Sequence, residues 1–105
     1  MENRYRTLET KIEEWAEDKG ILSKATPTTQ ALKTLEECNE LMDAIDKENR
    51  DETIDALGDI LVTLIIQAKM QNVDLLNCLQ SAYNVISKRT GVMKDGMFVK
   101  DKATN

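Results

Sequence analysis

The sequence has no histidine, four glycines and one proline among its 105 residues. So few turn-forming residues leave little room for the many turns of a β-sandwich. The absence of histidine also removes one cationic partner that a buried carboxylate could use. With 41% hydrophobic and 31% charged residues, the chain is typical of one soluble globular domain. We therefore expect a single domain over residues 1–105, small enough that oligomerisation would add stability.

No segment of the chain is suited to export or to a membrane. The N-terminus, with residues 1–4 Met-Glu-Asn-Arg, has no apolar h-region of the kind that a secretory signal peptide contains. The longest apolar run, residues 54–66, is interrupted by two aspartates and is too short to span a bilayer. Cys38 and Cys78 stand among apolar neighbours and are expected to be free, buried thiols rather than a disulfide. Together these features predict a cytoplasmic protein.

Acidic residues outnumber basic ones, 19 to 14, for a formal net charge of −5. Because no basic surface dominates, a nucleic-acid duplex is an unsuitable partner. Small polyanions remain compatible with the chain if metal ions screen the acids.

Helical periodicity dominates, and four helices are predicted. The first helix is amphipathic and ends at Gly20. Thr26 and Pro27 begin the second helix, and Asp74 caps the fourth. Asn49 or Asp51 is the predicted N-cap of the third helix, which is apolar on most sides and is therefore expected to be central. The predicted helices cover roughly residues 2–19, 27–48, 52–71 and 75–89.

The segment 91–105 differs in kind from the rest. Asp95 and Gly96 lie between two short apolar runs, a pattern typical of a β-hairpin. Such a two-stranded piece is only marginally stable alone. The fold class expected from the residues is therefore an all-α four-helix bundle with a short, hairpin-like C-terminal tail.

Carboxylates gather on the second and third predicted helices. Glu36, Glu37 and Glu40 fall within about 100° of arc on one helix, and Asp55 and Asp59 share a face of the next. A lone carboxylate in a buried helix costs several kcal/mol, so these aspartates need partners. A short connection makes the two helices antiparallel neighbours. Facing acids of this kind predict a site for Mg²⁺ or Mn²⁺, which prefer oxygen ligands.

The glutamates have a second interpretation. The apolar stripe of their helix centres near Cys38 and Met42, which places the glutamates and Lys33 on the opposite side. In a monomer that side is simply a solvated polar face. Further acids on the same helix fit this interpretation: Asp43, Asp46 and Glu48. The aspartates of the apolar third helix favour the metal site instead.

With these residues in view, the chain resembles the MazG-like nucleoside triphosphate pyrophosphohydrolases of the all-α NTP pyrophosphatase superfamily. The resemblance rests on residues 33–41, KTLEECNEL, followed by residues 55–64, DALGDILVTL. The family signature is E-x-x-E on one helix and E-x-x-D on the next, which together bind Mg²⁺. Glu37 and Glu40 match the first motif, with Glu36 as an additional acid, and Asp59 matches the aspartate of the second. The resemblance extends over about residues 8 to 100, and its ending is that of short, phage-type members.

One position departs from the family pattern. Ala56 stands three residues before Asp59, where the pattern has glutamate. Either Asp55, on the same helix face as Asp59, or Glu52, which reads E-x-x-D with Asp55, would supply the missing carboxylate. We expect Asp55 to do so, because Glu52 lies in the first helical turn, where the helix dipole favours acids without any metal.

The resemblance implies Mg²⁺-dependent hydrolysis of a (deoxy)nucleoside triphosphate to the monophosphate and pyrophosphate, for nucleotide-pool control or house-cleaning. The implied metal ligands are Glu37, Glu40, Asp55 and Asp59. Glu36 or Glu37 would orient the attacking water. The implied substrate-binding residues are Lys33, Asn84, Lys88 and Arg89, although the last two also suit a helix C-terminus electrostatically. Trp15 is predicted to be a core residue rather than a base-stacking platform.

Two alternatives stay open at this level. One is a related enzyme, a dUTPase, dCTPase or phosphoribosyl-ATP pyrophosphohydrolase. The other is a non-catalytic helical interaction module, which the departure at Ala56 makes worth testing. The apolar third helix in so short a chain, together with the resemblance, predicts a homodimer or homotetramer.

Overall fold

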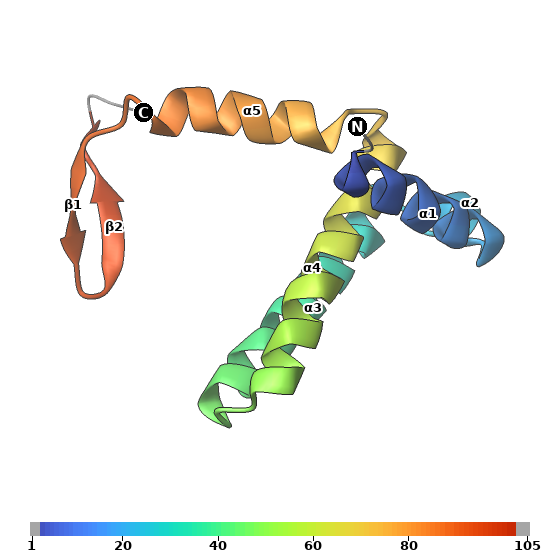
Figure 1. Cartoon of the computed structure of the whole chain (residues 1–105), viewed down its shortest axis with the longest axis horizontal. Helices are drawn as coiled ribbons and strands as arrows, with labels where there is room; N and C mark the ends of the chain where they lie inside the picture. The colour runs from blue at the N-terminus through green and yellow to red at the C-terminus, as the bar shows by residue number, and fades with distance from the viewer. Residues whose placement is uncertain (1–2, 103–105) are drawn as a thin grey trace. The chain divides into compact units, whose positions relative to one another are not determined.

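The computed structural model describes residues 3–102, which form five helices and a β-hairpin (Figure 1). The elements are α1 (Arg4–Asp18), α2 (Ile21–Lys24), α3 (Pro27–Asp46), α4 (Arg50–Gln71), α5 (Leu75–Ile86), β1 (Gly91–Lys94) and β2 (Met97–Lys100). The four predicted helices and the hairpin are therefore confirmed, with α2 as an addition. A single helical turn such as α2 carries no periodic stripe that a sequence pattern would reveal. The described residues divide into two compact units, up to Val73 and from Asp74 onward.

The helical hairpin of α3 and α4 is the centre of the first unit (Figure 1). Thr26 caps α3 in a reciprocal capping box with Thr29, and Pro27 follows at the first helical position. Glu48 takes a left-handed φ of 53° after α3, and the Asn49 side chain then accepts from the Glu52 N–H at 3.1 Å. Asn49, rather than Asp51, is thus the N-cap of α4. This short connection brings the two long helices back side by side.

The face of α3 that packs inward is not the predicted one. The buried residues of α3 are Gln30, Glu37 and Ala44, seven residues apart, so a mixed polar and small-residue face lies against α4. The expected apolar stripe points outward instead, with Leu35, Met42 and Ile45 exposed. Small and polar side chains let two helices approach closely, and large apolar ones are left for another surface.

The position of α4 is confirmed as central, because α1, α2 and α3 all contact it. Its buried residues cluster toward its C-terminal half: Ala56, Thr63, Ile65, Ile66 and Ala68. However, α4 is not covered on all sides as the sequence suggested. Four large apolar residues at heptad-like spacing are exposed: Ile54, Leu57, Leu61 and Leu64. No helix within residues 3–102 combines the length and apolarity needed to cross a bilayer.

The N-terminal helix α1 ends as predicted, one residue before Lys19 and two before Gly20. Gly20 has φ 78°, a left-handed conformation that glycine adopts without a steric penalty. The buried residue of α1 is Ala16, whereas the neighbouring Trp15 is exposed. The prediction of Trp15 as a core residue is therefore wrong.

The second unit consists of α5 and the hairpin. Asp74 caps α5 by accepting from the Leu76 N–H at 2.9 Å, and the helix ends at Ile86, three residues earlier than predicted. Strands β1 and β2 pair antiparallel in the register Gly91↔Lys100 to Lys94↔Met97. Asp95 and Gly96 both have positive φ, as a type I′ turn requires. Residues 103–105 of the predicted tail lie outside the described residues.

The two cysteines are free, as expected. Their environments differ from the prediction, because Cys38 is half-buried and Cys78 is exposed.

Candidate metal centre

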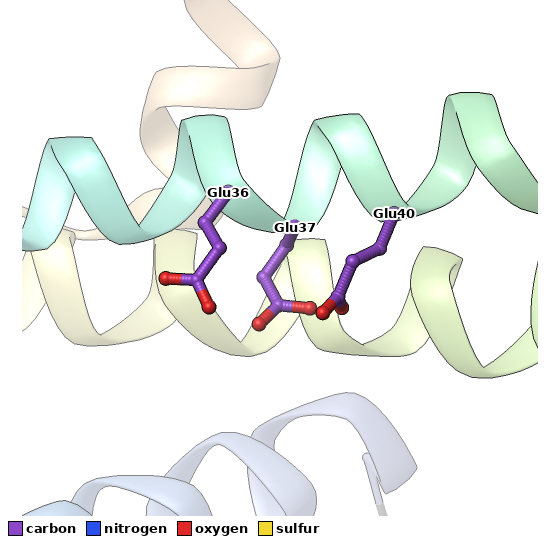
Figure 2. A group of neighbouring side chains, drawn as sticks. All are labelled: Glu36, Glu37 and Glu40. Atoms are coloured by element: carbon purple, nitrogen blue, oxygen red, sulfur yellow. The ribbon is translucent and has the colours of Figure 1, made fainter.

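Three glutamates of α3 converge on one point. Glu36, Glu37 and Glu40 each offer a carboxylate oxygen, and these three oxygens all lie within 4.8 Å of one another. Figure 2 shows the three side chains leaving the same side of α3, in the direction of α4. Three negative charges at this separation repel unless a cation stands between them. These three carboxylates lie close enough together to hold a divalent ion.

Glu37 distinguishes this cluster from an ordinary acidic surface. It is only 7% exposed, whereas Glu36 and Glu40 are exposed. Its Oε1 lies 3.5 Å from the Lys33 ammonium, and its Oε2 is buried without a hydrogen-bond partner among the described residues. An unsatisfied, buried carboxylate oxygen is costly, and a hard divalent ion would satisfy it. The residues present therefore fit a metal ion, and the solvated-face interpretation fails for Glu37.

The cluster also has an internal counter-charge. Lys33 Nζ lies 3.2 Å from Glu36 Oε1, and this hydrogen bond raises the pKa of Lys33, with the Glu36 and Glu37 charges acting in the same direction. The neighbouring Glu37 carboxylate raises the pKa of Glu40, because a proton there is shared by hydrogen bonding and because like charges repel. Both shifts have the same cause, which is the negative charge of the neighbouring glutamates.

The aspartates of α4 line an open cavity of about 330 Å³ beside the cluster. Acids from both helices line it: Glu40, Asp43, Glu52, Asp55 and Asp59, with Lys47 and Ala56. The facing acids predicted from the two helices are thus brought to one cavity. The prediction that Asp55 and Asp59 are buried is wrong, because both are exposed in a single chain. The cavity opens to solvent, and the apolar residues Ile54 and Leu57 near Asp55 are themselves exposed.

Ala56 occupies the position where the family pattern has glutamate. It is 3% exposed and lines the cavity, so its methyl group stands where a carboxylate would reach into the space between the helices. Glu52 and Asp55, four residues and one residue before that position, line the same cavity. Both remain able to replace the missing carboxylate.

Sequence reasoning missed Asp43 and Lys47 as cavity residues. Asp43 was grouped with the surface acids of its helix. Its position three residues after Glu40 and four before Lys47 places all three on one helical face, which is the signal that would have identified it.

The other predicted substrate-binding residues belong to the second unit. The Asn84 side-chain oxygen accepts from Gln80 Nε2 at 2.9 Å, so the amide is engaged along its own helix. Lys88 is exposed. Arg89 is half-buried, and its Nε is buried without a hydrogen-bond partner among the described residues. Lys33 is the one predicted substrate residue that the structure places within the glutamate cluster.

Residues 25–93 match the model of the MazG nucleotide pyrophosphohydrolase domain. The chain belongs to this family. The match begins just before α3 and ends within β1, so the glutamate cluster and the cavity aspartates all lie in the MazG domain. The resemblance stated from the two acidic motifs is thereby confirmed.

Two curated proteins are similar to this MazG chain. An uncharacterised 18.2 kDa protein from the rep-hol intergenic region of Haemophilus phage HP1 is 38% identical over 63 residues, which are 60% of this chain and 39% of the phage protein. The uncharacterised protein YabN of Bacillus subtilis is 35% identical over 68 residues, 63% of this chain and 14% of YabN. The chain thus spans well under half the length of these relatives. No solved structure matches the chain.

The ion pair of Lys33 generates a prediction. In Lys33→Met, Glu36 and Glu37 lose their internal counter-charge, so the metal-free protein should melt at a slightly lower temperature. The loss should be small, because exposed ion pairs contribute about 0–1 kcal/mol. The Mg²⁺ concentration needed for half-maximal thermal stabilisation should fall a few-fold, because the ion no longer competes with an ammonium group.

Lys47→Met is the matched control, since Lys47 lines the acidic cavity and forms no ion pair with another described residue. Equal Mg²⁺ effects in the two variants would mean that only overall charge matters and that the Lys33 contact has no specific role.

Proposed function

We propose that this MazG domain hydrolyses a (deoxy)nucleoside triphosphate to the monophosphate and pyrophosphate, with Mg²⁺ or Mn²⁺ as cofactor. The observation that carries the proposal is the buried, unpartnered Oε2 of Glu37 beside a cavity lined by acids of two helices. Carboxylates so close together repel a triphosphate unless divalent ions stand between them. Membership of the family supports the same reaction.

Glu37, Glu40 and Asp59 are the proposed metal ligands, with Asp55 as the fourth. When bound, the divalent ion supplies charge neutralisation for the phosphate oxygens and acidifies water. Asp59 lines the space next to Glu37 as well as the acidic cavity, so it is the α4 residue best placed to join the glutamates. The cluster thereby holds the phosphate chain between α3 and α4.

Glu36 is the proposed general base. Its side chain is exposed and belongs to the cluster, so it can orient water without losing a buried ligand position. The water oxygen forms a bond to the α-phosphorus as the bond from that phosphorus to the bridging oxygen breaks. The proton passes to the carboxylate, and pyrophosphate leaves. Lys33, once displaced from Glu36, stabilises the charge that develops on the leaving group.

The alanine at position 56, where the family pattern has glutamate, is the observation that supports the non-catalytic alternative. Mg²⁺ should raise the melting temperature under either function if the site binds metal, so activity decides between them. A pyrophosphate-release panel over canonical and damaged nucleotides, coupled to inorganic pyrophosphatase, is the direct test. Release from no nucleotide, together with Mg²⁺-dependent stabilisation, would favour the interaction module.

We also propose that the chain acts as a homodimer or homotetramer. The exposed stripes Leu35, Met42 and Ile45 of α3 and Ile54, Leu57, Leu61 and Leu64 of α4 give the helical hairpin a large apolar surface. Large exposed apolar patches mark interaction sites. A second copy, with its own stripe at the same spacing, is the simplest partner for a self-complementary interface.

Substitution of two proposed ligands tests the metal assignment. Asp59→Asn and Glu40→Gln should each lower turnover roughly a hundredfold or more, because each removes a charge that acts on the reacting phosphate. Both residues are exposed, so circular dichroism should show an intact fold. Asp46→Asn is the control, since Asp46 lies on the same helix outside the acidic cavity. Near wild-type turnover in either ligand variant would remove that residue from the site.

The departure at Ala56 gives a second test. Asp55→Ala should lower activity far more than Glu52→Ala, and high Mg²⁺ should recover part of the loss. The reason is that Glu52, in the first turn of α4, is already stabilised by the helix dipole without a metal. The reverse ranking in kcat/KM would assign the motif to Glu52. Equal, small effects would leave Asp59 working with the glutamates alone.

The oligomer is tested by sedimentation. Leu61→Asp should shift the protein at micromolar concentration toward monomer, because a carboxylate cannot be buried in an apolar interface without a large cost. Val73→Asp is the control, because Val73 is a similarly exposed apolar residue that follows α4 outside the stripe. A wild-type protein that sediments only as monomer would contradict the proposal.

A further inference from the structure

An apolar groove lies between α1 and α4 on the first unit, and we call it the α1–α4 groove. Its volume is about 390 Å³. Leu8 and Ile12 line it from α1, and Ile54, Leu61 and Ile65 line it from α4. Leu8, Ile54 and Leu61 are 46%, 53% and 44% exposed, so much of the apolar lining is open to water. Covering such a surface is favourable, because it removes apolar area from water.

Gly58 lines the same groove from the middle of α4. Glycine in a helix interior is destabilising relative to alanine, because it loses more conformational freedom on folding. Outside the backbone of its own helix and its chain neighbours, no described atom lies within 4 Å of the position that a Cβ would take there. No contact among the described residues therefore requires a glycine. A missing side chain on an exposed helix face permits the close approach of another helix.

The helix α5 carries an apolar face that is exposed. Its twelve residues, LLNCLQSAYNVI, include no charged residue, and none of them is buried. Leu76, Leu79, Tyr83 and Ile86 follow one another at spacings of three and four, so they share one face. The last three of them are 63%, 58% and 51% exposed. A helix of this length is marginal in water without a packed face, so α5 is expected to pack against another surface.

The two units differ in the sign of their charge. Residues 74–105 have five basic and three acidic residues, a net charge of +2, whereas residues 1–73 have nine basic and sixteen acidic residues, a net charge of −7. Lys88 and Arg89 follow α5 closely, and Asp55 and Asp59 are among the lining of the groove. An uncharged helix followed by cations thus matches an apolar groove that also holds acids.

We propose that α5 of a second copy occupies the α1–α4 groove, and that two copies of the chain exchange their α5 helices in this way. The inference rests on the proposed homo-oligomer and is independent of the proposed hydrolysis. A second copy is the occupant because Ile54 and Leu61 belong both to the groove and to the exposed stripe that is proposed to face that copy. Exchange about a twofold axis is reciprocal, so both grooves and both α5 helices are covered together.

The experiment measures sedimentation of the full-length protein without nucleotide, so its readout does not depend on the reaction. Gly58→Leu fills the groove with a side chain whose Cβ meets nothing in the chain and which favours the helix. It should raise the Kd of the dimer roughly tenfold or more, while the melting temperature of dilute protein stays the same or rises. Gly58→Ala adds only a methyl group and should weaken the dimer less.

A second pair of variants tests α5. Leu79→Asp places a carboxylate on the apolar face and should raise the same Kd roughly tenfold or more. Cys78→Asp is the matched control, because residue 78 lies about 100° further round the helix, away from that face. Its Kd should stay within about twofold of the wild-type value. Both residues are exposed, so neither variant removes a buried side chain.

A mixture of Gly58→Leu and Leu79→Asp chains separates exchange between copies from docking within one chain. A mixed pair has one unaltered groove opposite one unaltered α5. The mixture should therefore associate more tightly than either variant alone. If α5 instead occupies the groove of its own chain, mixing restores nothing.

Each contrary outcome is distinct. A wild-type Kd in Gly58→Leu or in Leu79→Asp, or a mixture that associates no better than its components, would overturn the exchange and leave an oligomer built on the stripes. A wild-type protein that sediments only as monomer would overturn the exchange together with the oligomer. Pyrophosphate release tests the reaction separately in every case.

Discussion

The first unit depends on the burial of one carboxylate. Glu37 lies in the seam between α3 and α4, where Gln30 and Ala44 are the other buried residues of its helix. A charged group at that position is costly unless it is paired. Lys33 pairs with one of its oxygens at 3.5 Å and leaves the other buried without a partner. The unit therefore folds around a buried carboxylate that an additional positive charge would stabilise.

The orientation of α3 follows from the burial of Glu37. Placing the face of Glu37 against α4 turns Leu35, Met42 and Ile45 outward, where all three are exposed. A helix cannot bury opposite faces against one neighbour. The inward position of Glu37 and the outward position of the apolar stripe are two results of one rotation of the helix. This connects the proposed metal centre to the proposed oligomer, since the surface that a second copy would cover exists because Glu37 is turned inward.

Lys33, Glu37 and Asp59 all border a second, mostly apolar cavity, and Asp59 borders the acidic cavity as well. The proposed chemistry takes place at the acidic cavity, where the carboxylates would hold the phosphates through a divalent ion. Gln30 and Thr63 join α3 to α4 by a hydrogen bond at the floor of the apolar cavity. Rigid packing beneath a site reduces the freedom lost when a ligand binds.

The sequence by itself determined four of the five described helices, the hairpin and their order. Capping residues at Thr26, Asn49 and Asp74, the Asp95–Gly96 turn and the helical periodicity are local signals, and local hydrogen bonding is enough to establish them. The two acidic motifs also identified the family, because their spacing is a property of the chain alone.

Only the tertiary structure decided which face of each helix is buried. Periodicity predicted the apolar stripe of α3 as the inner face and Asp55 and Asp59 as buried, and both expectations were wrong. A periodic pattern shows that a face will be covered but does not say by what, and in a short chain a second molecule is an available cover. The prediction that Trp15 is a core residue failed for the same reason. Its helical position marks it for packing, while the cavity beside it is created by four segments that meet only in the folded unit.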